Sequence, residues 1–211
     1  MRPRPTRPAG DTGDADPAVT AILAAYQAGE ATEHAALSAV AASRLLVPIV
    51  AVLADANADG TEKETEMALP TLIGNDGRAA VIAFTGADTL KSWRPDARPV
   101  PVAASRLWAA ALAEADAVVV DIAGPVPLTV EGARLAALAA GQPPPPAHQD
   151  PDIRAAVAEV IGDFTLGSGA PDADLEIAFN PADQAEAAAV ANQLAARLQP
   201  RLRRLRLRVT G

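Results

Sequence analysis

Residues 93–98, Trp-Arg-Pro-Asp-Ala-Arg, combine an aromatic ring, two guanidiniums and a carboxylate beside proline. Proline restricts the backbone in advance, so such a loop loses little conformational entropy when it meets a partner. Tryptophan and arginine are the side chains that most often dominate protein–protein interfaces. We therefore take Trp93, Arg94, Asp96 and Arg98 as candidate binding residues for a protein partner. The structural alternative is that Trp93 fills a gap beneath the loop and Asp96 pairs with an arginine.

The other residue types that could do chemistry do not predict a catalytic, metal or cofactor site. His34 lies near the start of a predicted helix and His148 lies in a proline-rich segment. Neither has the partner spacing of a metal site or a catalytic triad, and no serine lies in a G-x-S-x-G elbow. The loop containing Ser168 lacks the glycine spacing of a phosphate loop. The chain has no cysteine, which excludes disulfides, thiolate ligands and a cysteine nucleophile.

One strongly basic feature lies in the predicted last strand, over residues 203–209, where arginine alternates with leucine or valine. Such alternation makes one face apolar and the other cationic. The cationic face could bind nucleic acid, or it could pair with Asp174 and Glu176 if their strand is its neighbour. The net charge of −8 opposes general nucleic-acid binding. We expect the arginines to serve structure and solubility; they are Arg204, Arg206 and Arg208.

Composition limits the class of protein further. The 211 residues suffice for one large domain or two small ones, and half of them are apolar. No apolar run reaches the ~18–20 residues of a membrane-spanning helix, and the N-terminal arginines precede no apolar segment of a secretory signal. We expect a cytoplasmic protein that does not enter a membrane. The bias toward alanine, arginine and proline is typical of a GC-rich bacterial genome.

The elements that must position these residues are predicted to form two modules. A polar, proline-rich start predicts a disordered tail over residues 1–15. Residues 16–141 form the first module, residues 142–152 an extended and solvated polyproline linker, and residues 153–211 a second module.

The patterns of apolar residues, caps and turns predict the individual elements. In the first module, helices are expected from residue 17 to 28, from 33, over 87–93, over 104–114 and from either residue 129 or residue 131 to about 141. Strands are expected from 45, over 67–73, over 79–84 and from 117. The prolines of residues 94–101 are expected to prevent regular structure there. In the second module, the order is helix 153–161, strand 164–167, strand 175–179, helix 182–198 and strand 203–209.

The fold class that follows is α+β. We expect an N-terminal mixed α/β module with a central sheet and flanking helices, and a small C-terminal α-β-β-α-β module. In the first module, the residues of one helical stripe are Val19, Ile22, Leu23 and Tyr26. The residues of a later helix that are expected to face the core are Leu107, Trp108, Ala111 and Leu112.

Residues 16–141 resemble the N-terminal domain of the SseB family of bacterial proteins. The motifs that carry the resemblance are LLVP at 45–48, EMALP at 66–70, FT at 84–85, WRP at 93–95, RPVP at 98–101 and AVVVDIAGPV from 117. The second module is similar to the smaller domain that often follows in this family. The resemblance implies a cytoplasmic α/β protein and supplies no mechanism.

Three functional hypotheses remain. The first is a non-enzymatic protein-interaction or regulatory protein, which could also form a homo-oligomer. The second is an enzyme with a site between the two modules that uses Arg94, Asp96 and Arg98. The third is nucleic-acid binding through the arginines of the last strand.

Overall fold

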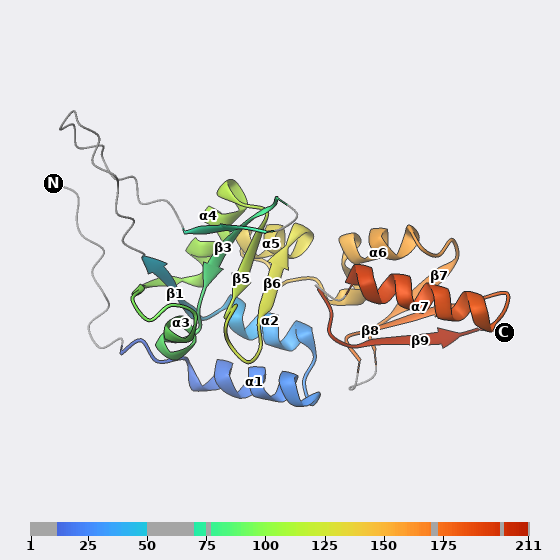
Figure 1. Ribbon diagram of the computed structural model, residues 1–211, viewed down its shortest axis with the longest axis horizontal. Helices are drawn as coiled ribbons and strands as arrows, with labels where there is room; N and C mark the ends of the chain where they lie inside the picture. The colour runs from blue at the N-terminus through green and yellow to red at the C-terminus, as the bar shows by residue number, and fades with distance from the viewer. Residues whose placement is uncertain (1–11, 50–69, 75–76, 170–172, 199–200, 211) are drawn as a thin grey trace.

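The computed structural model describes residues 12–49, 70–74, 77–169, 173–198 and 201–210 (Figure 1). Two modules follow one another along the chain, each with its own sheet and its own hydrophobic core. The α+β class is confirmed. The N-terminal module contains α1 (Pro17–Ala28), α2 (Glu33–Ala41), β1 (Arg44–Ile49), β2 (Thr71–Ile73), β3 (Ala79–Ala83), α3 (Ala87–Trp93), β4 (Arg98–Ala103), α4 (Ala104–Glu114), β5 (Ala117–Val120), β6 (Leu128–Glu131) and α5 (Gly132–Ala139).

The start of the N-terminal module follows its capping residues. Asp16 accepts a hydrogen bond from the backbone N–H of Ala18 at 2.8 Å, with Pro17 at the first helical position, and Gly29 ends α1 in the left-handed conformation. Thr32 caps α2 by accepting from the backbone N–H of Ala35. Most of the tail predicted over residues 1–15 lies outside the described residues, but Gly13 is buried and its carbonyl accepts from the backbone of α3.

The central sheet of the N-terminal module has the strand order β2-β3-β5-β6. The predicted hairpin is confirmed for its described residues, because β2 and β3 pair antiparallel with Thr71 opposite Val81. Residues 67–69 of the predicted first strand lie outside the described part. β3 and β5 are parallel, and β5 and β6 are antiparallel. The strand β6 was not predicted, because its four residues merge in sequence with the start of α5.

Helices cover mainly one face of this sheet. Buried side chains of α1, α2, α4 and α5 form one core with alternate residues of the strands, among them Val81, Val118 and Val130. Trp108 of α4 lies in this core, 1% exposed. A smaller cluster, with Ile82 and Phe84, lies under α3 on the other side. The expectation that Leu112 faces the core is wrong, since its side chain is 48% exposed.

The prediction that prolines prevent regular structure over residues 94–101 is wrong in part. β4 pairs antiparallel with β1, with Pro99 opposite Pro48 and Pro101 opposite Leu46. The backbone N–H of Leu46 donates to the carbonyl of Phe84 at 2.7 Å, and the carbonyl of Leu46 accepts from the N–H of Phe84 at 2.8 Å. Both backbone groups of Leu46 therefore point away from β4. The prolines therefore occupy positions whose nitrogen points out of the ladder, where no donor is needed.

The C-terminal module has the predicted order α-β-β-α-β. Its elements are α6 (Pro151–Ala158), β7 (Phe164–Gly167), β8 (Leu175–Phe179), α7 (Gln184–Leu198) and β9 (Leu205–Val209), preceded by the short 3-10 helix η1 (Ala147–Gln149). The sheet order is β7-β8-β9, with β8 and β9 parallel. Its core includes Ile153, Ile177 and Leu194, each 0% exposed.

The segment predicted as a solvated polyproline linker packs against the protein instead. Pro144 and Ala147 are buried, and Asp150 is 3% exposed. The two modules thus meet through a contact that includes α5 and α6. Within the part of the chain described here, no helix combines the length and apolarity needed to cross a membrane.

Candidate functional site

Most residues of the predicted binding loop are exposed. Arg94 Nε pairs with Asp96 Oδ1 at 3.1 Å, and the two side chains are 48% and 69% exposed. Arg98 is also exposed, at the first position of β4. Trp93 is partly buried, with its ring centroid 5.6 Å from that of Phe84. Both structural features considered from the sequence, a tryptophan beneath the loop and an aspartate paired with arginine, therefore occur.

The enzyme hypothesis placed this loop between the modules, and that location is wrong. The loop follows α3, which lies at the end of the N-terminal module remote from the C-terminal module (Figure 1). The arginines and the aspartate of the loop therefore do not face a site between the modules.

A hollow on the N-terminal module lies on the face of the central sheet opposite its main core. In register across the strands lie Leu72, Ala80, Ala117 and Glu131, and beside this row lie Val119 and Thr129. These residues line a hollow of about 540 Å³. The two alanines leave space at its floor, and Leu72 and Ile122 at its border are 37% and 39% exposed.

Arginines from both modules border this hollow. Arg78 precedes β3, while Arg197 and Arg201 come from the end of α7 and the segment after it. The carboxylate of Glu131 accepts from both Arg78 and Arg201, each at 2.5 Å. Arg197 pairs with Glu159 on the exposed surface. The surface combines an apolar floor with a border of ion-paired arginines and glutamates, and we call it the sheet-face surface.

A second polar group of residues is buried where the modules meet. Arg134 of α5 binds Glu33 of α2 through Nη1 at 2.7 Å and Asp150, the cap of α6, through Nε at 2.8 Å. All three side chains are at most 5% exposed. Burial raises the pKa of Glu33 to about 7, although Arg134 opposes this shift. We call these three residues the junction triad.

Next to the junction triad, Asp174 and Arg204 join the C-terminal module to the turn after α1. Asp174 accepts from the backbone N–H of Glu33 at 3.2 Å and from Arg204 Nη2 at 2.9 Å. Arg204 donates to the carbonyls of Gly29 and Ala31 at 2.9 and 2.6 Å, and its guanidinium lies 5.4 Å from the ring centroid of Tyr26. These contacts connect the C-terminal module to the N-terminal module and help to hold the two together.

The two histidines, which sequence spacing did not connect, line one pocket of about 240 Å³ at this junction. Ser168 and Thr32 contribute to the same lining. The Nδ1 atom of His34 is buried without a hydrogen-bond partner in the described residues, and burial lowers the pKa of this histidine. No sequence signal could have linked them, because the two histidines belong to elements that meet only through the packing of the modules.

Asp121 ties together the loops at the carboxyl ends of the parallel strands β3 and β5. It has a left-handed backbone, with φ 53°, and is 3% exposed. Its carboxylate accepts from the backbone N–H of Thr85 at 2.9 Å and from the hydroxyls of Thr85 and Thr89 at 2.6 Å each. These three hydrogen bonds compensate for the burial of the Asp121 carboxylate. They also hold its backbone in the left-handed conformation, which is unfavourable for a residue other than glycine.

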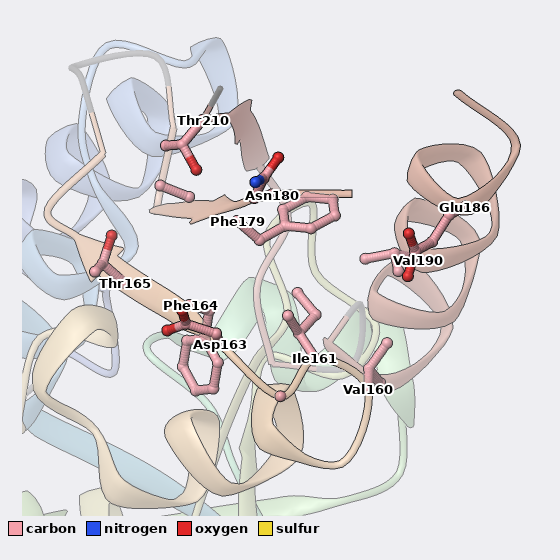
Figure 2. A pocket seen from close by; sticks show the side chains of 12 residues that line it. Val160, Ile161, Asp163, Phe164, Thr165, Phe179, Asn180, Glu186, Val190 and Thr210 are labelled. Carbon is pink, nitrogen blue, oxygen red and sulfur yellow. The ribbon is translucent and has the colours of Figure 1, made fainter. Parts of the chain in front are cut away.

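A pocket of about 460 Å³ lies within the C-terminal module (Figure 2). Figure 2 shows Glu186 and Val190 of α7 on one side and Asp163 and Phe164 on the other. The Glu186 carboxylate accepts from the backbone N–H of Ala182 at 2.5 Å, and the Glu186 N–H donates to Asp183 at 2.8 Å. Asp183 thus accepts from the first turn of α7, and the Glu186 side chain reaches back to the residue before Asp183, so both carboxylates stabilise the start of the helix.

Arg208 of β9 and Arg204 just before it pair with carboxylates, as the structural hypothesis predicted for them. Glu176 of β8 lies beside β9 and accepts from Arg208 Nε at 2.9 Å, and Asp174 accepts from Arg204. The nucleic-acid hypothesis required an arginine face without neutralising carboxylates. Arg204 and Arg208 do not supply such a face.

The structure also separates the expected effects of changing these two arginines. Arg208→Gln should change the free energy of unfolding by at most ~1 kcal/mol, because its pair is exposed. Arg204→Gln should cost about 1–3 kcal/mol, because it leaves the buried Asp174 carboxylate and two backbone carbonyls without their donor. Urea unfolding of both variants measures the difference, and equal losses would contradict it.

Comparison with known families agrees with the geometry of the N-terminal module. The family model of the SseB protein N-terminal domain matches residues 19–137, which run from the first turn of α1 into α5. Comparisons with curated proteins and with solved structures gave no match. The matched segment contains the central sheet and the helices that cover its main core.

Proposed function

The chain belongs to the SseB family, and we propose that it acts by binding another protein through the sheet-face surface. The observation that carries this proposal is the exposure of apolar side chains from β2 and from the loop after β5, with Leu72 37% and Ile122 39% exposed. Contiguous apolar surface with a charged border is typical of protein interaction sites.

The strands beneath this surface support the same proposal. β3 and β5 pair in parallel and read AAVIA and AVVV. Such continuous apolar strands are typical of sheets that are covered on both faces. Here Val119 and Ala80 are only partly buried. A partner that covered them would complete the second layer.

The loop with Trp93, Arg94, Asp96 and Arg98 stays a predicted contact surface. It lies on the same side of the sheet, since Trp93 packs against the small cluster that contains Ile82. Ile82 and Ala80 are two residues apart on β3 and share a face. A large partner on the sheet-face surface could therefore also reach this loop.

Three variants test the proposed function. Leu72→Gln combined with Ile122→Gln removes apolar contact, Arg94→Ala combined with Arg98→Ala removes the guanidiniums of the loop, and Leu112→Gln is the control. Leu112 is equally exposed, at 48%, but belongs to α4 on the other face. Each purified protein is used to capture partners from extracts of its native cell, and each captured partner is then titrated against it.

The sheet-face variant should bind its partner at least tenfold more weakly than the parent does, with unchanged circular dichroism. The Leu112→Gln control should bind as the parent does. If the loop variant loses less affinity for the partner than the sheet-face variant does, the loop lies at the edge of the interface. If the sheet-face variant and the parent capture and bind the same partners equally, the proposed function fails.

A further inference from the structure

A pocket of about 280 Å³ opens at the carboxyl ends of the parallel strands β3 and β5, and it shares no residue with the sheet-face surface. Thr85 follows β3, Asp121 follows β5, and α1 contributes Leu23 to the lining. Two motifs of the family resemblance, FT at 84–85 and AVVVDIAGPV from 117, supply part of this lining. In open α/β sheets, ligands bind in the crevice outside the carboxyl ends of the strands.

Asp121 differs from the other buried carboxylates of the described residues, each of which pairs with an arginine. Those others are Glu33, Asp150 and Asp174. Asp121 is 3% exposed, and its hydrogen-bond donors in the described part of the chain are neutral groups of Thr85 and Thr89. Arg44 donates to the carbonyl of Thr85 and does not line the pocket. The hydrogen bonds therefore satisfy lone pairs of Asp121 but leave a buried negative charge without a paired cation.

The side chains that line the pocket offer mainly hydrogen-bond acceptors. Three lining hydroxyls already donate their protons to other groups of the protein; they belong to Thr20, Thr85 and Thr89. Their oxygens can still accept, and Asp88 adds a second carboxylate. Gln27 alone among the described lining residues offers side-chain N–H groups, and none of these residues is an arginine, lysine or histidine. A matching ligand therefore donates hydrogen bonds and carries positive charge.

An ammonium group matches this lining better than other organic cations do. A carboxylate has about four lone-pair sites, and three hydrogen bonds already occupy Asp121. It therefore cannot accept both N–H groups of a guanidinium fork. A quaternary ammonium has no N–H and is bound by aromatic faces, and no aromatic side chain is among the described lining residues. A primary ammonium has three donors, and Leu23, Pro125 and Val126 can pack against a short hydrocarbon chain.

We propose that this pocket binds a small primary amine in its ammonium form. The ammonium donates to the remaining lone pair of Asp121 and to the neighbouring threonine oxygens, while its hydrocarbon chain contacts Leu23 and Val126. Asp88, which is exposed, attracts the cation at the entrance. This site is separate from the sheet-face surface, so the proposal does not depend on the proposed function.

The test is a titration of the isotope-labelled full chain with n-pentylamine at pH 7, followed by NMR. The neutral n-pentanol and the anion pentanoate are probes with a chain of the same length. The backbone signals of Thr85, Thr89 and Asp121 should shift with pentylamine, which should bind at least tenfold more tightly than either other probe.

Two variants and a control locate the site. Asp121→Asn should weaken pentylamine binding at least tenfold, because it removes the charge that attracts the ammonium. Ala24→Phe should weaken binding as much, because this exposed position of α1 lines the pocket and a phenyl ring would occupy it. Ala18→Phe is the control, since it is exposed on the same helix but outside the lining, and it should bind as the parent does.

The proposal is overturned if pentylamine does not bind, if pentanol or pentanoate binds as tightly, or if the shifted signals lie outside the pocket. Equal binding by Ala24→Phe and Ala18→Phe would also refute it, and this comparison holds even if Asp121→Asn does not fold. Binding of Mg²⁺ or Ca²⁺ at these residues in place of the amine would show a metal site and refute the ammonium. Each of these outcomes leaves the capture of a protein partner by the sheet-face surface to be judged separately.

Discussion

Replacing Arg134 by methionine should lower the free energy of unfolding by about 3–5 kcal/mol. The guanidinium lies between Glu33 and Asp150, at 2.7 and 2.8 Å, and its side chain is 4% exposed. Methionine fills a similar volume but leaves two buried carboxylates without a cation. Urea unfolding at pH 8, above the pKa of Glu33, measures the loss.

A matched control is Arg197→Met, which removes an ion pair whose side chains are 47% and 60% exposed. It should cost at most ~1 kcal/mol. Adding Glu33→Gln and Asp150→Asn to Arg134→Met should restore much of the lost stability, because the buried charges are then gone and asparagine still caps α6. If Arg134→Met and Arg197→Met cost the same, the junction triad does not stabilise the protein as its burial implies.

The sequence predicted those parts of the fold whose causes are local. The cap at Asp16 and the glycine at Gly29 bound α1 as predicted, because one hydrogen bond and one left-handed residue decide each end. The hairpin of β2 and β3 and the alternating pattern of β9 were likewise read from neighbouring residues. The missed pairing of β4 depends on a distant strand. A proline interrupts the pairing of two strands only where its nitrogen points toward the partner strand. Whether Pro99 and Pro101 do so depends on where β1 lies beside them.

The junction triad could not be predicted in the same way. The sequence analysis placed Glu33 at the start of a predicted helix and Asp150 in the predicted linker. In the structure Glu33 lies in the first turn of α2, as expected, whereas Asp150 caps α6. One signal was present: Arg134 and Leu138 are four residues apart on α5 and share a face, and both are buried. An arginine on an apolar face indicates a buried partner. It does not say which of 26 acidic residues that partner is.

The sheet-face surface escaped prediction because its residues look like core. The run Ala117–Val120 was read as a buried strand, and on one face it is, with Val118 0% and Val120 1% exposed. Val119 faces the other way and is only partly covered in the described part of the chain. Whether a strand is buried on one face or on both depends on whether other elements pack against each face of its sheet. The residues of the strand alone do not determine this.

The stability of the protein should fall as the pH rises from about 4.5 to 7, and Glu33 should be a main cause. Burial raises the pKa of its carboxyl from 4.5 to about 7 in the folded protein. Between these values the unfolded chain releases the proton and the folded chain keeps it. The stabilisation is therefore complete below pH 4.5 and is lost as the pH rises through 7. A difference of about 2.5 pKa units corresponds to about 3 kcal/mol.

Glu33→Gln isolates this contribution, because the amide keeps the shape of the side chain and does not titrate. Urea unfolding of parent and variant at half-unit steps from pH 4 to 8 gives the difference in their free energies of unfolding. That difference should change by about 3 kcal/mol across the window, with the parent losing stability relative to the variant as the pH rises. Glu159→Gln, at an exposed ion pair, should show no such change. Parallel curves for the parent and Glu33→Gln would mean that Arg134 keeps Glu33 ionised throughout, and that the charge of the junction does not respond to pH in this range.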